Sequence, residues 1–123
     1  MDRSQVTRWL EAYVAAWKSG ERDEIRELFG EDVRYRYHPW DEPLVGRDAV
    51  ADSWLEEPDP PGSFEARYEC FAVEGDSAVA VGASTYRKAD GTVSRVYDNV
   101  FLLRFDADGR CSDFTEWFME RPR

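Results

Sequence analysis

The sequence has few of the residues from which metal and redox sites are built. Among 123 residues there are two cysteines, Cys70 and Cys111, and one histidine, His38. No Cys-x-x-Cys pair, His-Glu-x-x-His motif, glycine-rich phosphate loop or Gly-x-Ser-x-Gly motif is present. We therefore expect no metal and no cofactor. Both cysteines lie in strand-like runs, where we expect buried free thiols of a cytosolic protein; a single disulfide is the alternative.

Long apolar segments and a surplus of positive charge are also missing. No stretch approaches the ~20 apolar residues that a membrane span needs, and no apolar signal core follows the first five residues. With 16 Lys and Arg against 26 Asp and Glu, the net charge is −10. This argues against nucleic acid and anionic membranes as partners. We expect a cytoplasmic protein.

Aromatic residues, in contrast, are abundant. They make up 15% of the chain, and hydrophobic residues make up 42%. A chain of this length and apolar content can bury a core without disulfides or metal, and its rings either fill that core or line a concave pocket. There are no repeats or linkers, so the sequence predicts one domain over residues 1–123.

The spacing of apolar residues changes along the chain from helical to alternating. From Val6 to Trp17 they recur at intervals of three and one, which predicts a helix that ends at Gly20. Further on they alternate with polar residues, which predicts strands, and Asp90-Gly91 is a strong hairpin signal. Helices are expected over residues 4–19, 25–29 and 46–57, and strands over residues 33–38, 64–74, 78–87, 93–105 and 111–119. The order α-α-β-α-β-β-β-β predicts an α+β fold with the helices on one face of a sheet.

Three segments carry a family resemblance. They are Trp9 and Trp17 followed by the run 28–33, the run 43–50 (Pro-Leu-Val-Gly-Arg-Asp-Ala-Val), and Asp108-Gly109-Arg110 followed by Thr115-Glu116-Trp117. In this order and spacing the chain resembles the nuclear-transport-factor-2-like superfamily, and within it the SnoaL-like branch. The resemblance implies a cone, in which a strongly curved antiparallel or mixed sheet wraps a long N-terminal helix and leaves a pocket open at one end.

The resemblance also implies a homodimer through the outer face of the sheet. The strands support this independently, because the helices can cover only one of two apolar sheet faces. The apolar residues expected on the outer face are Val79, Val81, Val96, Val100, Trp117 and Met119.

Glu116 is the clearest candidate for chemistry. On its strand it shares a face with Phe114 and Phe118. A carboxylate between aromatic neighbours is costly to bury as an ion, so its pKa should rise into the range of a general acid or base. The resemblance points to the same residue, since the epoxide-hydrolase branch has a catalytic acid at the matching place. That branch also has an Arg-x-Asp pair, which the strand at 84–87 (Ser-Thr-Tyr-Arg) lacks, so epoxide hydrolysis is not expected. The alternative for Glu116 is a structural carboxylate.

Asp98 and Asn99 point to opposite faces of one strand. The Asn99 face continues into Leu103 and Phe105, so we expect Asn99 to line the pocket and Asp98 to face outward. His38, after the first strand, is a candidate proton shuttle; a surface histidine is the alternative. The expected catalytic residues are thus Glu116, Asn99 and His38.

The remaining candidates are aromatic residues expected to bind the ligand. They are Tyr13, Trp17, Tyr37, Trp40, Trp54, Tyr86, Phe101 and Phe114. We expect them to form a largely apolar cavity in which few polar groups converge. Residues 41–60 hold seven acids and one base; if they lie near the mouth, they would disfavour anionic ligands.

Together these features predict a protein that binds a small apolar or polyketide-like molecule. A cofactor-free acid/base enzyme of the isomerase, dehydratase or cyclase type fits best, with Glu116 as acid or base and Asn99, a tyrosine or His38 polarising an oxygen. The alternative is a non-catalytic ligand-binding or dimerisation module, since the same fold can serve either role.

Overall fold

The computed structural model describes all residues from 1 to 123 and contains three helices and a six-stranded sheet. The helices are α1 (Arg3–Ser19), α2 (Arg22–Glu27) and α3 (Arg47–Glu56); the strands are β1 (Phe29–Arg36), β2 (Leu44–Val45), β3 (Phe64–Glu74), β4 (Ser77–Arg87), β5 (Val93–Phe105) and β6 (Cys111–Glu120). The strand order is β2-β1-β6-β5-β4-β3. All neighbours are antiparallel except β1 and β6, which are parallel.

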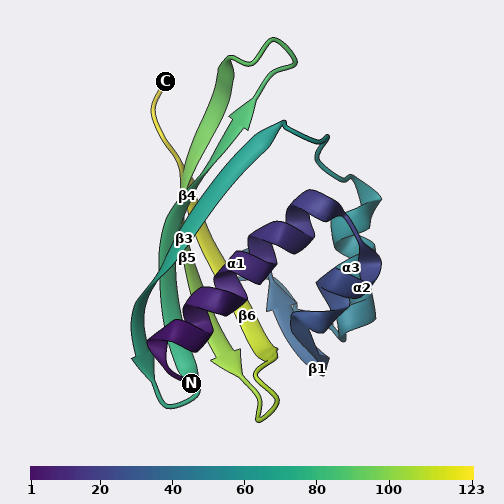
Figure 1. Cartoon of the computed structure of the whole chain (residues 1–123), viewed down its shortest axis with the longest axis vertical. Helices are drawn as coiled ribbons and strands as arrows, with labels where there is room; N and C mark the ends of the chain where they lie inside the picture. The colour runs from purple at the N-terminus through teal and green to yellow at the C-terminus, as the bar shows by residue number, and fades with distance from the viewer.

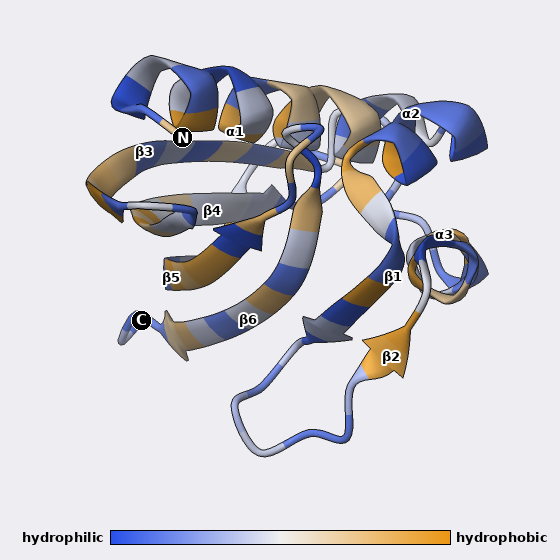
Figure 2. Cartoon of the chain, turned by 90° about the horizontal axis from the view of Figure 1, so that it is seen from below, coloured by the Kyte–Doolittle hydropathy of each residue, from blue (hydrophilic) through white to orange (hydrophobic).

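The sheet curves around α1, which crosses its concave side (Figure 1). Figure 2 shows α1 over β3 and β4, with α3 beside β1 and β2. This is the α+β cone expected from the sequence. None of the helices combines the length and the apolar character that crossing a membrane requires.

The long first helix begins at Arg3, one residue before its predicted start, and ends at Ser19 as predicted. Asp2 caps its N-terminus by accepting a hydrogen bond from the backbone N–H of Gln5 at 2.8 Å, and the Gln5 side-chain oxygen accepts one from the backbone N–H of Asp2. Gly20 ends the helix in the left-handed conformation, with φ of 65°. The buried stripe of α1 therefore lies at a fixed position over the sheet, which places Trp9 and Tyr13 in the core.

An aromatic cluster fills the space between α1 and the sheet. The Tyr13 ring stacks on Phe114 at 5.9 Å between ring centres and lies 5.4 Å from Phe101. Phe114 in turn stacks on Tyr35 at 4.4 Å. Cys70 and Cys111 are both buried and unbonded to each other.

Two local features differ from the sequence prediction. Phe29 was expected at the end of the second helix, but it begins β1 because it pairs with Cys111 across the parallel ladder to β6. The Leu28 carbonyl accepts bonds from the Cys111 N–H and the Trp9 indole, both at 2.9 Å, and these tertiary contacts end the helical turn. The second feature is β2, whose two residues are too few to show a periodic pattern.

Candidate functional site

A cavity of about 370 Å³ opens on the concave side of the sheet. Its walls come from α1, β1, α3 and the loop after it, and strands β3 to β6. Most lining residues are aromatic, with polar side chains between them: Tyr13, Trp17, Tyr35, Tyr37, Ser53, Trp54, Glu57, Asp59, Tyr68, Ser84, Tyr86, Arg95, Tyr97, Asn99, Glu116 and Phe118.

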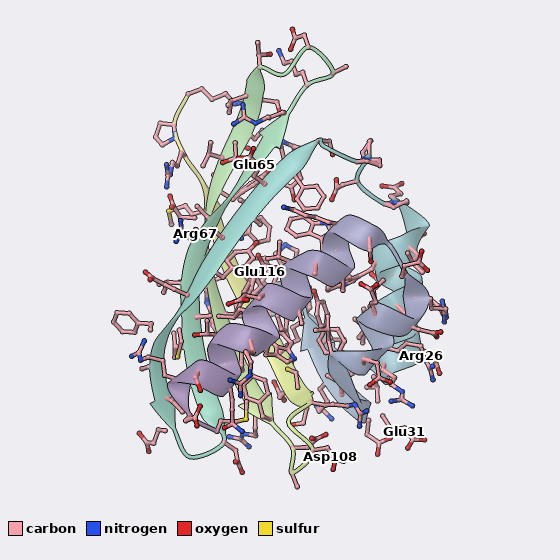
Figure 3. All side chains as sticks on the ribbon, viewed as in Figure 1. Arg26, Glu31, Glu65, Arg67, Asp108 and Glu116 are labelled. Carbon is pink, nitrogen blue, oxygen red and sulfur yellow. The ribbon has the colours of Figure 1, made fainter.

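Glu116 lies on the wall of this cavity, between the sheet and α1 (Figure 3). The alternation of β6 directs Phe114, Glu116 and Phe118 to the concave side. Phe114 is fully buried below, whereas Phe118 is 44% exposed at the mouth. Glu116 is therefore held at an intermediate depth, which a ligand can reach but bulk water solvates poorly.

Burial raises the pKa of the Glu116 carboxyl to about 7. Two weaker effects oppose this: a hydrogen bond from Asn99 and the nearby charge of His38 when that ring is protonated. The Asn99 amide donates from Nδ2 to Glu116 Oε2 at 2.7 Å. The other carboxyl oxygen, Oε1, has no hydrogen-bond partner. Every fully buried side-chain nitrogen or oxygen atom in the structure has one, so Oε1 is not fully buried. Oε1 is therefore open to the cavity.

Asn99 is itself held by a neighbouring strand. Its Oδ1 accepts a hydrogen bond from the Ser84 hydroxyl at 3.2 Å. Ser84, Asn99 and Glu116 form a diagonal across β4, β5 and β6, because Ser84 pairs with Tyr97 and Glu116 with Phe101, the residues two before and two after Asn99. The Asn99 amide thus binds Ser84 through its oxygen and Glu116 through its nitrogen, and in this way it orients the Glu116 carboxyl.

Phenol groups surround Glu116. Burial raises the pKa of each of these hydroxyls, and the charge of Glu116 adds to the rise; the residues are Tyr13, Tyr35, Tyr37, Tyr68 and Tyr86. The most accessible of them, Tyr86, has a pKa of about 12. Near neutral pH all five are uncharged, so they can donate hydrogen bonds to a ligand without losing a proton.

The mouth of the cavity carries charges of both signs. Asp59 accepts a hydrogen bond from the Trp17 indole at 3.0 Å, and Glu57 lies close by on the same loop. On the other side, the Arg95 guanidinium lies over the rings of Tyr86 and Tyr97, 5.5 and 5.8 Å from their centres. With Glu116, the lining holds three carboxyl groups and one guanidinium.

Comparison with known proteins agrees with this architecture. The family model of the SnoaL-like domain matches residues 10–114. The chain belongs to the SnoaL-like domain family. No curated protein matches it.

Two solved structures share the fold of this SnoaL-like domain. One is an NTF-2-like protein of unknown function from Burkholderia xenovorans LB400, with 19% identity and a TM-score of 0.71 over 98% of this chain and 87% of that one. The other is an LEH-like epoxide hydrolase from M. tuberculosis, with 14% identity and a TM-score of 0.68 over 95% of this chain and 84% of that one. At these identities the likeness shows the fold alone.

The SnoaL-like domain brings most of the predicted site residues together. Glu116 and Asn99 lie on the cavity wall, whereas Asp98 is on the outer face and is paired with Arg121 at 2.7 Å. Five of the predicted aromatic residues also line the cavity: Tyr13, Trp17, Tyr37, Trp54 and Tyr86.

Three predicted ligand-binding residues do not line the cavity. Phe101 and Phe114 point inward, but they lie deeper than the cavity floor, where other rings cover them. Trp40 is 79% exposed and stacks on His38 outside the cavity. His38 does not line the cavity either; its Nδ1 is 2.9 Å from Asp41 Oδ2, and its charge reaches Glu116 only through space.

The cavity is more polar than the sequence predicted. Nine lining residues were not among the predicted site residues: Tyr35, Ser53, Glu57, Asp59, Tyr68, Ser84, Arg95, Tyr97 and Phe118. Tyr97 and Arg95 lie two and four residues before Asn99 on β5, so the alternation of side chains along the strand directs them inward as well. This pattern could have identified them from the sequence. For Glu57 and Asp59, which lie in an irregular loop, no periodic pattern was available.

A larger hollow of about 890 Å³ lies on the opposite face of the sheet. Its carboxylates are exposed, and one of them, Asp98, is neutralised by Arg121. Neither of its carboxylates, Glu69 and Asp98, is buried. No cluster of three or more His, Cys, Asp or Glu side chains in the structure is arranged to hold a metal ion. The concave cavity is the better candidate for chemistry.

Proposed function

We propose that this SnoaL-like domain binds a small molecule in its concave cavity and transfers a proton within it, using Glu116 as acid and base. The observation that carries the proposal is the state of Glu116. Its carboxyl is largely buried, its pKa is about 7, and Oε1 is open to the cavity. A group that titrates near the working pH can both accept and return a proton at appreciable rates.

The surrounding groups support an isomerase, dehydratase or cyclase type of reaction. The ionised Glu116 removes a proton from a carbon next to a carbonyl group, and the electron pair moves onto the carbonyl oxygen. A neutral phenol such as Tyr13 or Tyr68 can hydrogen-bond to that oxygen as its charge grows. Isomerisation is completed when Glu116 returns the proton to another carbon, and dehydration when a neighbouring hydroxyl leaves as water with that proton.

The proposed ligand is uncharged or positively charged. Carboxyl groups outnumber guanidinium groups in the lining by three to one, and the whole chain has a net charge of −10. Both fields oppose an anion. The aromatic walls and phenol hydroxyls fit a compact ring system that carries a few oxygen atoms.

Epoxide hydrolysis, the activity named for the M. tuberculosis structure, is not part of the proposal. Asn99 is the hydrogen-bond partner of Glu116, and no arginine contacts this carboxyl. The nearest lining arginine, Arg95, lies four residues before Asn99 on β5, which is about 13 Å along an extended strand.

A separate observation favours dimerisation through the outer face of the sheet. Val100, Trp117 and Met119 are 39%, 43% and 75% exposed there, although they belong to adjacent strands of a regular sheet. The hollow that they line also contains Arg67, Glu69, Asp98 and Arg121. A face with apolar residues and charges of both signs can pair with a copy of itself about a two-fold axis.

Binding and proton transfer can be tested together. A thermal-shift screen of uncharged, cationic and anionic ring compounds identifies ligands, because a tight ligand at a hundredfold excess over its Kd stabilises the fold by about 2.7 kcal/mol. Exchange of ligand protons with deuterated solvent, followed by NMR, then reports proton transfer. The proposal expects exchange with the parent protein and none with Glu116→Gln, while the exposed control Glu74→Gln exchanges normally. Binding without exchange in the parent would leave a ligand-binding module.

A further inference from the structure

We infer that Ser84 is a positioning residue for Glu116, because its hydroxyl holds the Asn99 amide with the NH₂ group, rather than the carbonyl, turned toward the carboxyl. The functional meaning of this inference rests on the proposed role of Glu116. The effect of Ser84 on the proton affinity of the Glu116 carboxyl does not depend on that role.

The geometry assigns each end of the amide to one neighbour. Ser84 is 3% exposed on β4 and Asn99 is 6% exposed on β5, so water does not compete for their polar atoms. The Ser84 hydroxyl donates to Asn99 Oδ1 at 3.2 Å, and Asn99 Nδ2 donates to Glu116 Oε2 at 2.7 Å. A buried amide oxygen that already has a donor gains nothing by turning away from it.

The direction of the amide decides which form of Glu116 is favoured. An N–H donor stabilises the carboxylate, whereas a carbonyl oxygen in its place can only accept a bond from the protonated acid. The Asn99 hydrogen bond does lower the pKa of Glu116 against the larger effect of burial. Without the Ser84 hydroxyl, the carbonyl of Asn99 loses its donor, and the protonated Glu116 carboxyl becomes the nearest replacement.

Other titratable groups face Glu116, but none of them is hydrogen-bonded to its carboxyl. They are Tyr13 from α1, Tyr35 and Tyr37 from β1, His38 after β1, Tyr68 from β3 and Tyr86 from β4. Ser84 also interacts with Tyr68, whose pKa it lowers slightly against burial. A control must therefore separate the effect of Ser84 on Asn99 from its effect on Tyr68.

The test is a ¹³C NMR titration of the Glu116 carboxyl carbon in four proteins: the parent, Ser84→Ala, Ser84→Thr and Tyr68→Phe. We expect Ser84→Ala to raise the proton affinity of Glu116 by roughly threefold to tenfold, which is half a pKa unit to one unit. Ser84→Thr keeps the hydroxyl and should restore the parent value, and Tyr68→Phe should leave the value near that of the parent.

An unchanged Glu116 titration in folded Ser84→Ala protein overturns the inference and leaves Ser84 as a packing residue. If Ser84→Ala does not fold, Ser84→Cys replaces it; the weaker thiol donor should give a smaller upward shift, and no shift again overturns the inference. Failure of the proposed function looks different: the parent Glu116 would then titrate near its ordinary value, whatever the variants do.

Discussion

Tyr68 on β3 lies directly across from Gly82 on β4, and its ring occupies the space that a side chain at position 82 would fill. A β-carbon on Gly82 would lie 2.6 Å from Tyr68 Cδ1 and 2.7 Å from Tyr68 Cα. Gly82 also pairs with Asn99 across β4 and β5. The glycine therefore brings a cavity phenol close to the residue that orients Glu116.

The first prediction concerns this glycine. Gly82→Ala should lower the free energy of unfolding by about 1–3 kcal/mol, because the β3 backbone and the Tyr68 ring must move to relieve the overlap. Urea unfolding monitored by tryptophan fluorescence measures the change. A variant as stable as the parent would mean that the two strands are less closely packed than described.

The second prediction is a pH dependence of stability that comes from Glu116. Its folded pKa of about 7 lies above the unfolded value of about 4.5. Both states are protonated at low pH; as the pH rises from 4.5 to 7, only the unfolded state ionises and stability falls, and above 7 the loss is complete. By linkage the full loss is roughly 3 kcal/mol.

Glu116→Gln removes this ionisation while keeping an oxygen that can accept the Asn99 hydrogen bond. Relative to the parent, the variant should be similar in stability at pH 4 and progressively more stable up to pH 8. Urea melts across this range, with Glu74→Gln as the exposed control, provide the measurement. If the variant is instead clearly less stable at pH 7, Glu116 is a paired structural carboxylate.

The third prediction concerns ligand charge. Among phenethylamine, phenethyl alcohol and phenylacetate, which share a ring and differ in charge, affinity should fall in that order, because the lining carboxylates attract a cation and repel an anion. NMR titration of each ligand gives the Kd values. Asp59→Asn, which can still accept the Trp17 hydrogen bond, should reduce the preference for the amine. Tighter binding of phenylacetate would show that Arg95 dominates the mouth.

The fourth prediction concerns assembly. Sedimentation equilibrium at tens of micromolar should give twice the 14.3 kDa mass of one chain. Val100→Asp places a charge in the apolar part of the outer face and should yield monomers. Val45→Asp, at a valine that is more exposed than Val100 and lies on the distant edge strand β2, should remain dimeric. A monomeric parent protein at this concentration excludes the dimer.

Strand parity explains why the centre of the site could be predicted from sequence. Glu116 lies between Phe114 and Phe118 on one face of β6, and Asn99 shares its face with Phe101, so both were expected to point inward. The alternation of side chains along a strand does not show how deep in the cone an inward-facing residue lies. Phe101 and Phe114 were therefore expected at the cavity surface, although they are buried beneath it.

Other parts of the site depend on contacts between distant segments. The two-residue strand β2 exists because it pairs with β1, and Trp40, in the loop between these two strands, is exposed and does not line the cavity. The Ser84–Asn99–Glu116 chain requires the register of three strands, which no local pattern specifies. The polar character of the cavity follows from these tertiary placements.

The central claim is that the Glu116 carboxyl titrates near neutral pH inside the cavity. The most direct test is a ¹³C NMR titration of the glutamate side-chain carboxyl carbons in the parent protein, with the Glu116 resonance assigned by its absence in Glu116→Gln. We expect a Glu116 midpoint of about 7. A Glu116 midpoint near its ordinary value of 4.5 would rule out the proposed role of this carboxyl.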